Sequence, residues 1–184
     1  MAVSTSPHLL QTPFELFTTV KDEFFSLATT HRPDLTQFGP SISSKSRTGD
    51  APVNWDQMFA PAAWRPFHRG AFGVHWIVAC RRARNTGLYT VHLALGVENP
   101  VEAGQVRDGF KADVVAQMKV QRIDLPEWTV WRPSLGTRKK LLVGPRVAMA
   151  EGAERELFQQ FVDADATVPI VTDLLERWAA ARRA

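Results

Sequence analysis

The chain has 184 residues, of which 45% are hydrophobic, and it carries a formal net charge of +3 at pH 7. This length supports one domain with a sizeable core and is short for two, so we expect a single domain over residues 1–184. The single cysteine, Cys80, excludes an intramolecular disulfide. No apolar run approaches the ~18 residues that cross a membrane, and no basic stretch with an apolar core opens the chain. We therefore expect a soluble, cytoplasmic protein without membrane contact.

Positive charge is concentrated in the middle of the chain. Lysine and arginine number 14 against 6 acidic residues over residues 62–147, which gives this region a charge of +8. The same counts are 4 against 6 for residues 1–61 and 4 against 7 for residues 148–184. A surface with this excess attracts phosphate groups or an acidic protein surface.

The N-terminal third predicts one helix and little regular structure after it. Residues 1–11 lack any periodic pattern and are expected to be a disordered tail. The run Thr12-Pro13-Phe14-Glu15 has the form of a capping box, and apolar residues at helical spacing predict a helix over 13–30. Residues 39–54 are rich in serine, proline and glycine and predict a flexible loop. Two prolines interrupt residues 55–70, which leaves room only for a short helix that packs irregularly.

Two strands with a shared loop are the clearest pattern in the sequence. Apolar residues alternate with others over 74–80 and again over 89–95, as expected for strands with one buried face. The charged segment 81–87 between them ends in a glycine and predicts a hairpin loop.

The register of this hairpin makes a further prediction about its polar residues. Both apolar sets lie on one face only if even positions of the first strand pair with odd positions of the second. His75 and His92 then lie together on the opposite face, joined there by Arg81 and Thr90.

The second half predicts a helix, a second hairpin and two more helices. The pattern favours a helix over 100–121, strands at 128–131 and 138–147, and helices over 150–164 and 168–183. The element order α-β-β-α-β-β-α-α indicates an α+β domain. We expect a largely antiparallel four-stranded sheet, built from the two hairpins and covered by helices on one face.

Residues 64–184 resemble a known domain in the placement of their aromatic and aliphatic residues. The features are a glycine-containing strand at 70–74, aliphatic residues at 91–95, Phe110 in a helix, a tryptophan-bearing strand at 127–131 and a tryptophan in the last helix. This succession is similar to an uncharacterised bacterial domain that is appended to nuclease-like proteins of DNA restriction and defence. The chain has Gln117-Met118-Lys119-Val120 where members of that family commonly carry acidic residues. The resemblance implies an accessory or nucleic-acid-associated role and supplies no active-site residues to transfer.

The basic residues beside the two hairpin turns are the candidate binding site for DNA or RNA. If both turns point the same way, their positive charges form one edge on which Trp131 can stack against a base. The candidate residues are Arg81, Arg82, Arg84, Trp131, Arg138, Lys139 and Lys140. The sequence therefore favours a non-catalytic nucleic-acid-associated module of a bacterial defence or phage system.

Two other function classes are compatible with the sequence. The first is a protein-interaction module, such as a phage inhibitor or immunity-type protein that blocks a partner, or a homodimer. The second is a small enzyme that gathers His75 or His92 with a carboxylate such as Asp124 or Glu127. The sequence has no recognisable nuclease, phosphate-loop, zinc-protease or serine-hydrolase motif, so we expect no catalytic residues, cofactor or metal.

Overall fold

The computed structural model describes residues 11–38, 54–69, 73–83, 85–98, 104–134 and 139–181. Within these ranges, the α-helices are α1 (Pro13–His31), α2 (Gly104–Val120), α3 (Ala153–Ala164) and α4 (Thr167–Ala181), and η1 (Ala62–Arg69) is a 3₁₀ helix. The strands are β1 (Leu35–Phe38), β2 (Asn54–Pro61), β3 (Gly73–Arg82), β4 (Tyr89–Glu98), β5 (Thr129–Val130), β6 (Lys140–Val143) and β7 (Val147–Ala148).

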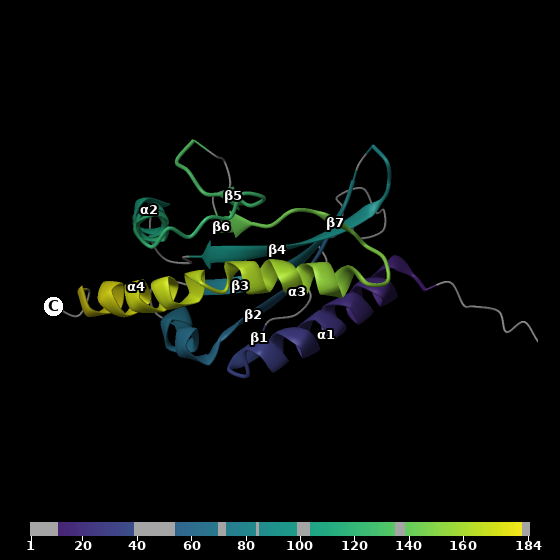
Figure 1. Cartoon of the computed structure of the whole chain (residues 1–184), viewed down its shortest axis with the longest axis horizontal. Coiled ribbons are helices and arrows are strands. Elements are labelled where there is room, and N and C mark those ends of the chain that lie inside the picture. Colours follow the sequence, from purple (N-terminus) through teal and green to yellow (C-terminus); the bar gives the residue numbers. More distant parts are fainter. Residues whose placement is uncertain are drawn as a thin grey trace, which may run out of the picture.

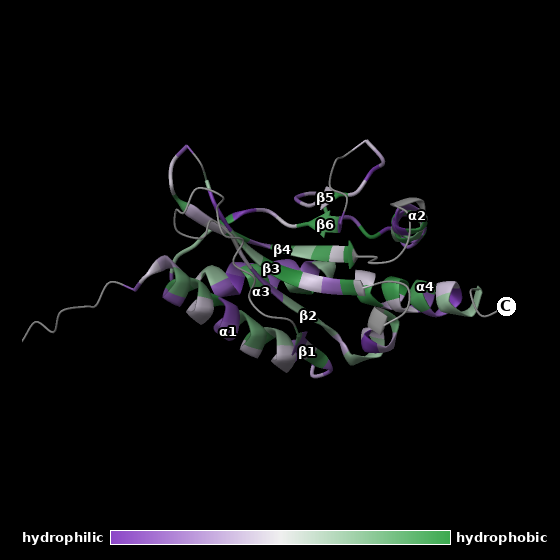
Figure 2. Ribbon diagram, turned by 180° about the vertical axis from the view of Figure 1, so that it is seen from behind, coloured by the Kyte–Doolittle hydropathy of each residue, from purple (hydrophilic) through white to green (hydrophobic). Residues whose placement is uncertain are grey.

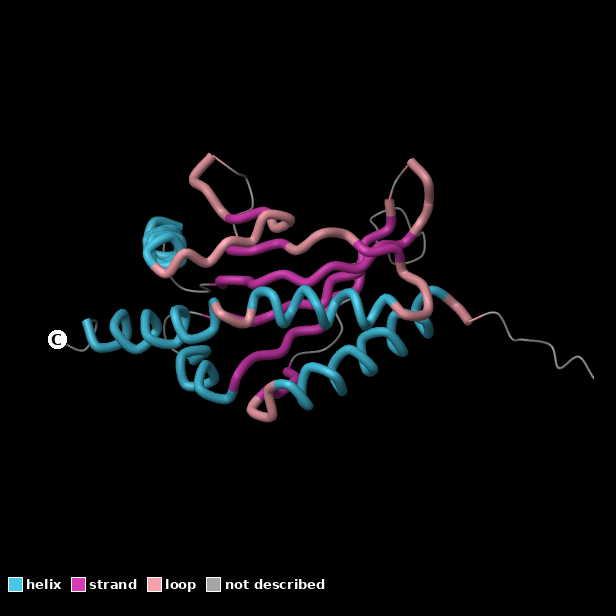
Figure 3. Tube along the Cα trace, viewed as in Figure 1, coloured by secondary structure: helices cyan, strands magenta, loops and turns pink. Residues whose placement is uncertain are grey.

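The strands form one antiparallel sheet in the order β1-β2-β3-β4-β6-β5, and β7 pairs with the beginning of β4. The prediction of an α+β domain is thus confirmed, whereas the prediction of four strands is wrong because the described sheet has seven. Both predicted hairpins are present, as β3 with β4 and as β5 with β6. Figures 1 and 3 show the long strands β2, β3 and β4 crossing the middle of the molecule.

The sheet is larger than predicted because β1 and β2 carry no clear strand signal. Strand β2 contains Gln57 on the same face as Trp55 and Phe59, which interrupts the apolar alternation. It also ends at Pro61, and the two prolines of residues 55–70 predict irregular structure rather than a strand. The predicted short helix is present as η1, with Pro66 inside it.

The first helix forms as its sequence predicts. Thr12 is the N-cap, and its hydroxyl accepts a hydrogen bond from the main-chain N–H of Glu15 at 3.2 Å. The Glu15 carboxylate accepts in return from the main-chain N–H of Thr12 at 2.7 Å, which holds the pKa of Glu15 below its usual value. Phe17, Val20 and Phe24 are buried on one side of the helix, so packing on the sheet completes its stability.

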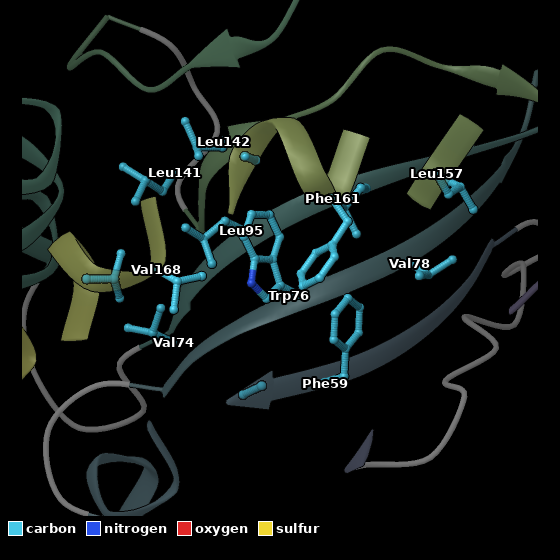
Figure 4. Close-up of a cluster of buried hydrophobic side chains, with 14 of the residues drawn as sticks. Phe59, Val74, Trp76, Val78, Leu95, Leu141, Leu142, Leu157, Phe161 and Val168 are labelled. Carbon is cyan, nitrogen blue, oxygen red and sulfur yellow. The ribbon is translucent and has the colours of Figure 1, made fainter. Parts of the chain in front are cut away.

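The core lies between the sheet and helices α1 and α3. Figure 4 shows Phe161 of α3 pointing toward Trp76 of β3 and Phe59 of β2. The ring centroids of Phe161 lie 5.6 Å from Trp76 and 6.0 Å from Phe59, and Phe24 of α1 lies 5.5 Å from Phe59. These edge-on contacts join three elements that are far apart in the sequence. In Figure 2, the central strands carry long apolar stretches.

The later elements follow their predictions with shorter bounds. Helices α3 and α4 confirm the predicted helices at 150–164 and 168–183, and α2 confirms most of the helix predicted at 100–121. The strand predicted at 138–147 is divided into β6 and β7, because Gly144 and Pro145 lie between them. The predicted tail and nearly all of the loop at 39–54 lie outside the described residues. None of the described helices is long and apolar enough to cross a membrane.

Candidate anion-binding site

The hairpin register fixes which side chains share a face of the sheet. Trp76 pairs with Leu95, Val78 with Leu93 and Cys80 with Val91, so even positions of β3 pair with odd positions of β4 as predicted. These residues are on the face that α1 and α3 cover. His75, Arg81, Thr90 and His92 therefore lie on the opposite face, which we call the polar face.

The two histidines share the polar face but do not adjoin. His75 pairs with Gly96, whereas His92 pairs with Ala79, so they are four positions apart along the hairpin, about 13 Å at the usual strand rise. The His75 ring instead makes an edge contact with Phe38, with the centroids 5.8 Å apart. The shared face of the two histidines is therefore confirmed, but they do not lie together there, because the parity of the register sets the face of a residue and not its distance from another.

The partner of His92 is Lys140 of strand β6. The Nζ atom of Lys140 lies 3.2 Å from Nε2 of His92, and the His92 residue is only 3% exposed. Burial, followed by the nearby charges of Lys140, Arg81 and Arg146, lowers the pKa of His92 to about 3. His92 is therefore neutral at physiological pH, and Nε2 accepts the hydrogen bond because an ammonium group can only donate.

Arg81 is held beside this pair by Asp56 of strand β2. Nη1 of Arg81 lies 2.6 Å from Oδ1 of Asp56, and Nη2 lies 3.1 Å from Oδ2. This two-pronged geometry matches the planar guanidinium to the planar carboxylate. The side chains of Arg81 and Asp56 are 26% and 33% exposed, so the ion pair is partly open to solvent. Asp56 was missed in the sequence because β2 was not recognised as a strand.

Four adjacent strands thus contribute to one group of polar side chains, which we call the polar cluster: Asp56, Arg81, His92 and Lys140. Burial lowers the pKa of Lys140, and Arg81 and Arg146 lower it further, whereas Asp56 opposes this shift. Around His92, the positive charges of Arg81, Lys140 and Arg146 are therefore opposed by one carboxylate, that of Asp56. Such an arrangement is costly by itself and is relieved when an anion binds.

The two basic turns do not form a single edge. Strand β3 ends at Arg82, which pairs with Tyr89 at the start of β4, whereas β6 begins at Lys140, which pairs with Gly96 near the end of β4. The described parts of the two turns accordingly lie at opposite ends of the sheet (Figure 1). The prediction of one common basic edge is therefore wrong. Strand β6 begins opposite the end of β4, so the turn before β6 lies at the other end of the sheet from the turn between β3 and β4.

The remaining predicted binding residues are divided between the surface and the core. Arg82 is exposed, and its guanidinium lies 5.9 Å from the ring centroid of Tyr89. Lys139 is also exposed. Trp131 is only 7% exposed, and Nζ of Lys111 lies 5.3 Å from its ring centroid, so the ring does not offer a free face to a base. Arg84 and Arg138 lie outside the described residues.

Nothing in the described geometry assembles the predicted acid and base pair. Asp124 and Glu127 are exposed in the segment between α2 and β5, and Asp56 is the carboxylate that acts on the polar cluster. Burial raises the pKa of the Cys80 thiol to about 12, as expected for a structural cysteine. Among the described residues, no group of three histidine, cysteine, aspartate or glutamate side chains is placed to hold a metal ion.

Comparisons with known proteins add no further information about the site. No protein-family model matches this chain, and no curated protein or solved structure matches it significantly.

Proposed function

We propose that the protein is a non-catalytic binding module that recognises the phosphate groups of a single-stranded nucleic acid on the polar face of its sheet. The observation that carries this proposal is the contact of Lys140 with the buried, neutral His92, beside which the charge of Arg81 acts on both side chains. These residues come from three strands, so the rigid sheet presents both cations in a fixed geometry. A fixed pair of cations suits a ligand with regularly spaced negative charges.

The electrostatics of the polar cluster favour an anionic ligand over a cation or a neutral group. Arg81 and Arg146 lower the pKa of Lys140 by charge repulsion, in addition to the effect of burial. A phosphate group beside Lys140 would offset this repulsion and raise its pKa again. Binding should therefore take up protons at a pH near the pKa of Lys140, as linkage requires.

A single strand fits better than a duplex because the cationic groups lie on a sheet face. An extended strand can follow the surface and place successive phosphates near Arg81 and Lys140. The exposed Arg146, whose charge also acts on His92 and Lys140, extends the positive surface beyond the cluster. The assignment to a bacterial defence or phage system rests only on the resemblance of residues 64–184.

The proposal is tested by fluorescence anisotropy with a labelled single-stranded oligonucleotide at low salt. Lys140→Gln keeps a hydrogen-bond donor toward His92 but removes the charge, and we expect it to weaken binding roughly tenfold. Lys140→Arg keeps the charge and should retain most of the affinity. Arg155→Gln is the matched control, because this arginine is 86% exposed on α3 and lies away from the polar face.

Equal affinity of the wild-type protein and the Lys140→Gln variant would contradict the proposal, provided that circular dichroism shows the variant to be folded. A loss of binding in the Arg155→Gln control would also contradict it, since diffuse positive charge would then explain the interaction.

A further inference from the structure

A groove on another part of the surface runs between helix α2 and strand β5. It has a volume of about 660 Å³. Its helix side consists of Ala112, Val115, Ala116 and Lys119, and its strand side consists of residues 128–133. We call this feature the α2–β5 groove, and it shares no residue with the polar cluster.

Helix α2 presents two different stripes. Phe110, Val114 and Met118 recur at four-residue spacing and are buried. Ala112 and Ala116 lie on the groove side and are exposed, and Val115 between them is partly exposed. Small side chains at these positions keep space open between the helix and the strand, so a further chain segment can approach closely.

Strand β5 is the last strand of the sheet on this side, and its main chain is arranged to accept another strand. The N–H of Trp131 donates to the carbonyl of Leu141 at 2.8 Å, which makes these two residues a hydrogen-bonded pair. In an antiparallel ladder such pairs alternate with pairs whose main-chain groups point outward. Val130, which pairs with Leu142, therefore directs its N–H and C=O away from β6.

The charges at the groove have one sign. Among the described residues that line it, the charged ones are Lys119 and Arg132, both exposed. They come from opposite walls, because Lys119 belongs to α2 and Arg132 follows β5. An occupant with carboxylates on both sides of an apolar centre would complement this arrangement.

We propose that the α2–β5 groove binds an acidic, extended segment of a partner protein, which adds to the sheet as a strand beside Val130. The main chain of the segment would exchange hydrogen bonds with Val130, its apolar side chains would cover the wall formed by Ala112, Val115 and Ala116, and its carboxylates would approach Lys119 and Arg132. This is a second binding activity, separate from the anion site on the polar face.

A nucleic-acid strand fits this groove less well than a peptide. The aromatic residues of the groove, Trp128 and Trp131, are only 9% and 7% exposed, so their ring faces are not available to stack on bases. The outward N–H and C=O of Val130 form a pair of groups that matches another main chain.

The direct test uses a fluorescein-labelled hexapeptide in which glutamate and valine alternate. We expect it to bind, and we expect its counterpart with lysine in place of glutamate to bind at least tenfold more weakly. A third peptide, with N-methyl groups on alternate main-chain nitrogens, keeps the charges but cannot pair with a strand and should also lose binding. Backbone amide NMR signals of Val130 and Ala116 should shift on titration with the first peptide.

Two variants locate the interaction on the protein. Ala116→Trp fills the groove from the helix side and should abolish binding, whereas Ala180→Trp changes an exposed alanine of α4 and should leave binding intact. The double variant Lys119→Glu with Arg132→Glu should reverse the preference between the acidic and the basic peptide.

Four outcomes would overturn the inference. They are equal binding of the acidic and basic peptides, retained binding of the N-methylated peptide, an Ala116→Trp variant that binds normally, or an oligonucleotide that displaces the peptide while shifting the same amides. Failure here leaves the proposal for the polar face untouched, because the Lys140→Gln measurement does not involve this groove.

Discussion

Lys140 and His92 approach each other across the boundary between strands β6 and β4, with Nζ and Nε2 3.2 Å apart. Since Lys140 can only donate, the neutral His92 must carry its proton on Nδ1. That Nδ1 atom is buried and has no hydrogen-bond partner among the described residues. The polar cluster thus fixes both the charge and the tautomer of a histidine inside a sheet.

The first prediction concerns acid stability. The folded-state pKa of His92 is about 3, below its ordinary value of 6.5, so the unfolded chain binds the extra proton between these two values. The contribution of His92 to the free energy of unfolding is fully present above pH 6.5. It falls as the pH drops toward 3, by at most about 1.4 kcal/mol per pH unit. His92→Gln should flatten this dependence, which urea unfolding across the window measures. An unchanged slope would show that His92 is not the group responsible.

The second prediction is that removing a negative charge from the polar cluster strengthens the binding of an oligonucleotide. Asp56→Asn removes the carboxylate that pairs with Arg81, so the polar face gains one positive charge where Arg81 already faces the ligand. We expect the affinity for a single-stranded oligonucleotide to rise roughly threefold at low salt. Asp163→Asn, at an exposed position of α3, is the control for a change in overall charge. If both variants gain equally, the effect is not local to the cluster.

The third prediction concerns the attachment of α3 to the sheet. The side chain of Gln160 is buried, accepts a hydrogen bond from the N–H of Leu93 at 3.3 Å and donates one to the carbonyl of Pro145 at 3.1 Å. Gln160→Leu removes both bonds and should lower the free energy of unfolding by about 2 kcal/mol. Gln159→Leu, on the exposed side of the helix, should cost less than about 0.5 kcal/mol. Denaturant titration of both variants compares them, and equal costs would contradict this role of Gln160.

The sequence was informative where periodicity was strong and local. The capping box at Thr12 and the alternation in β3 and β4 predicted a helix and a hairpin with the observed parity. Parity is a local property, since each residue of a strand points opposite to the next. It assigned His75, Arg81 and His92 to one face but could not fix the spacing between the two histidines.

The polar cluster itself depends on strand order, which the sequence patterns did not reveal. Asp56 reaches Arg81 because β2 pairs with β3, and Lys140 reaches His92 because β6 pairs with β4. Neither pairing joins two strands linked by a short turn, because η1 lies between β2 and β3, and α2 and β5 lie between β4 and β6. The predicted common edge of basic turns was wrong for the same reason, because the position of β6 along β4 decides where its turn lies.

The fourth prediction tests the central claim most directly, through the salt dependence of binding. We would measure the dissociation constant for a single-stranded oligonucleotide over a range of salt concentrations, for the wild-type protein, the Arg81→Gln with Lys140→Gln double variant, and the Arg155→Gln control. The logarithm of the association constant falls linearly with the logarithm of the salt concentration. Each lost phosphate contact reduces the magnitude of this slope by about 0.7 for a single strand. The double variant should therefore lose about 1.4 from the slope, and the control should keep it. Equal slopes for all three proteins would contradict the assignment of phosphate binding to the polar face.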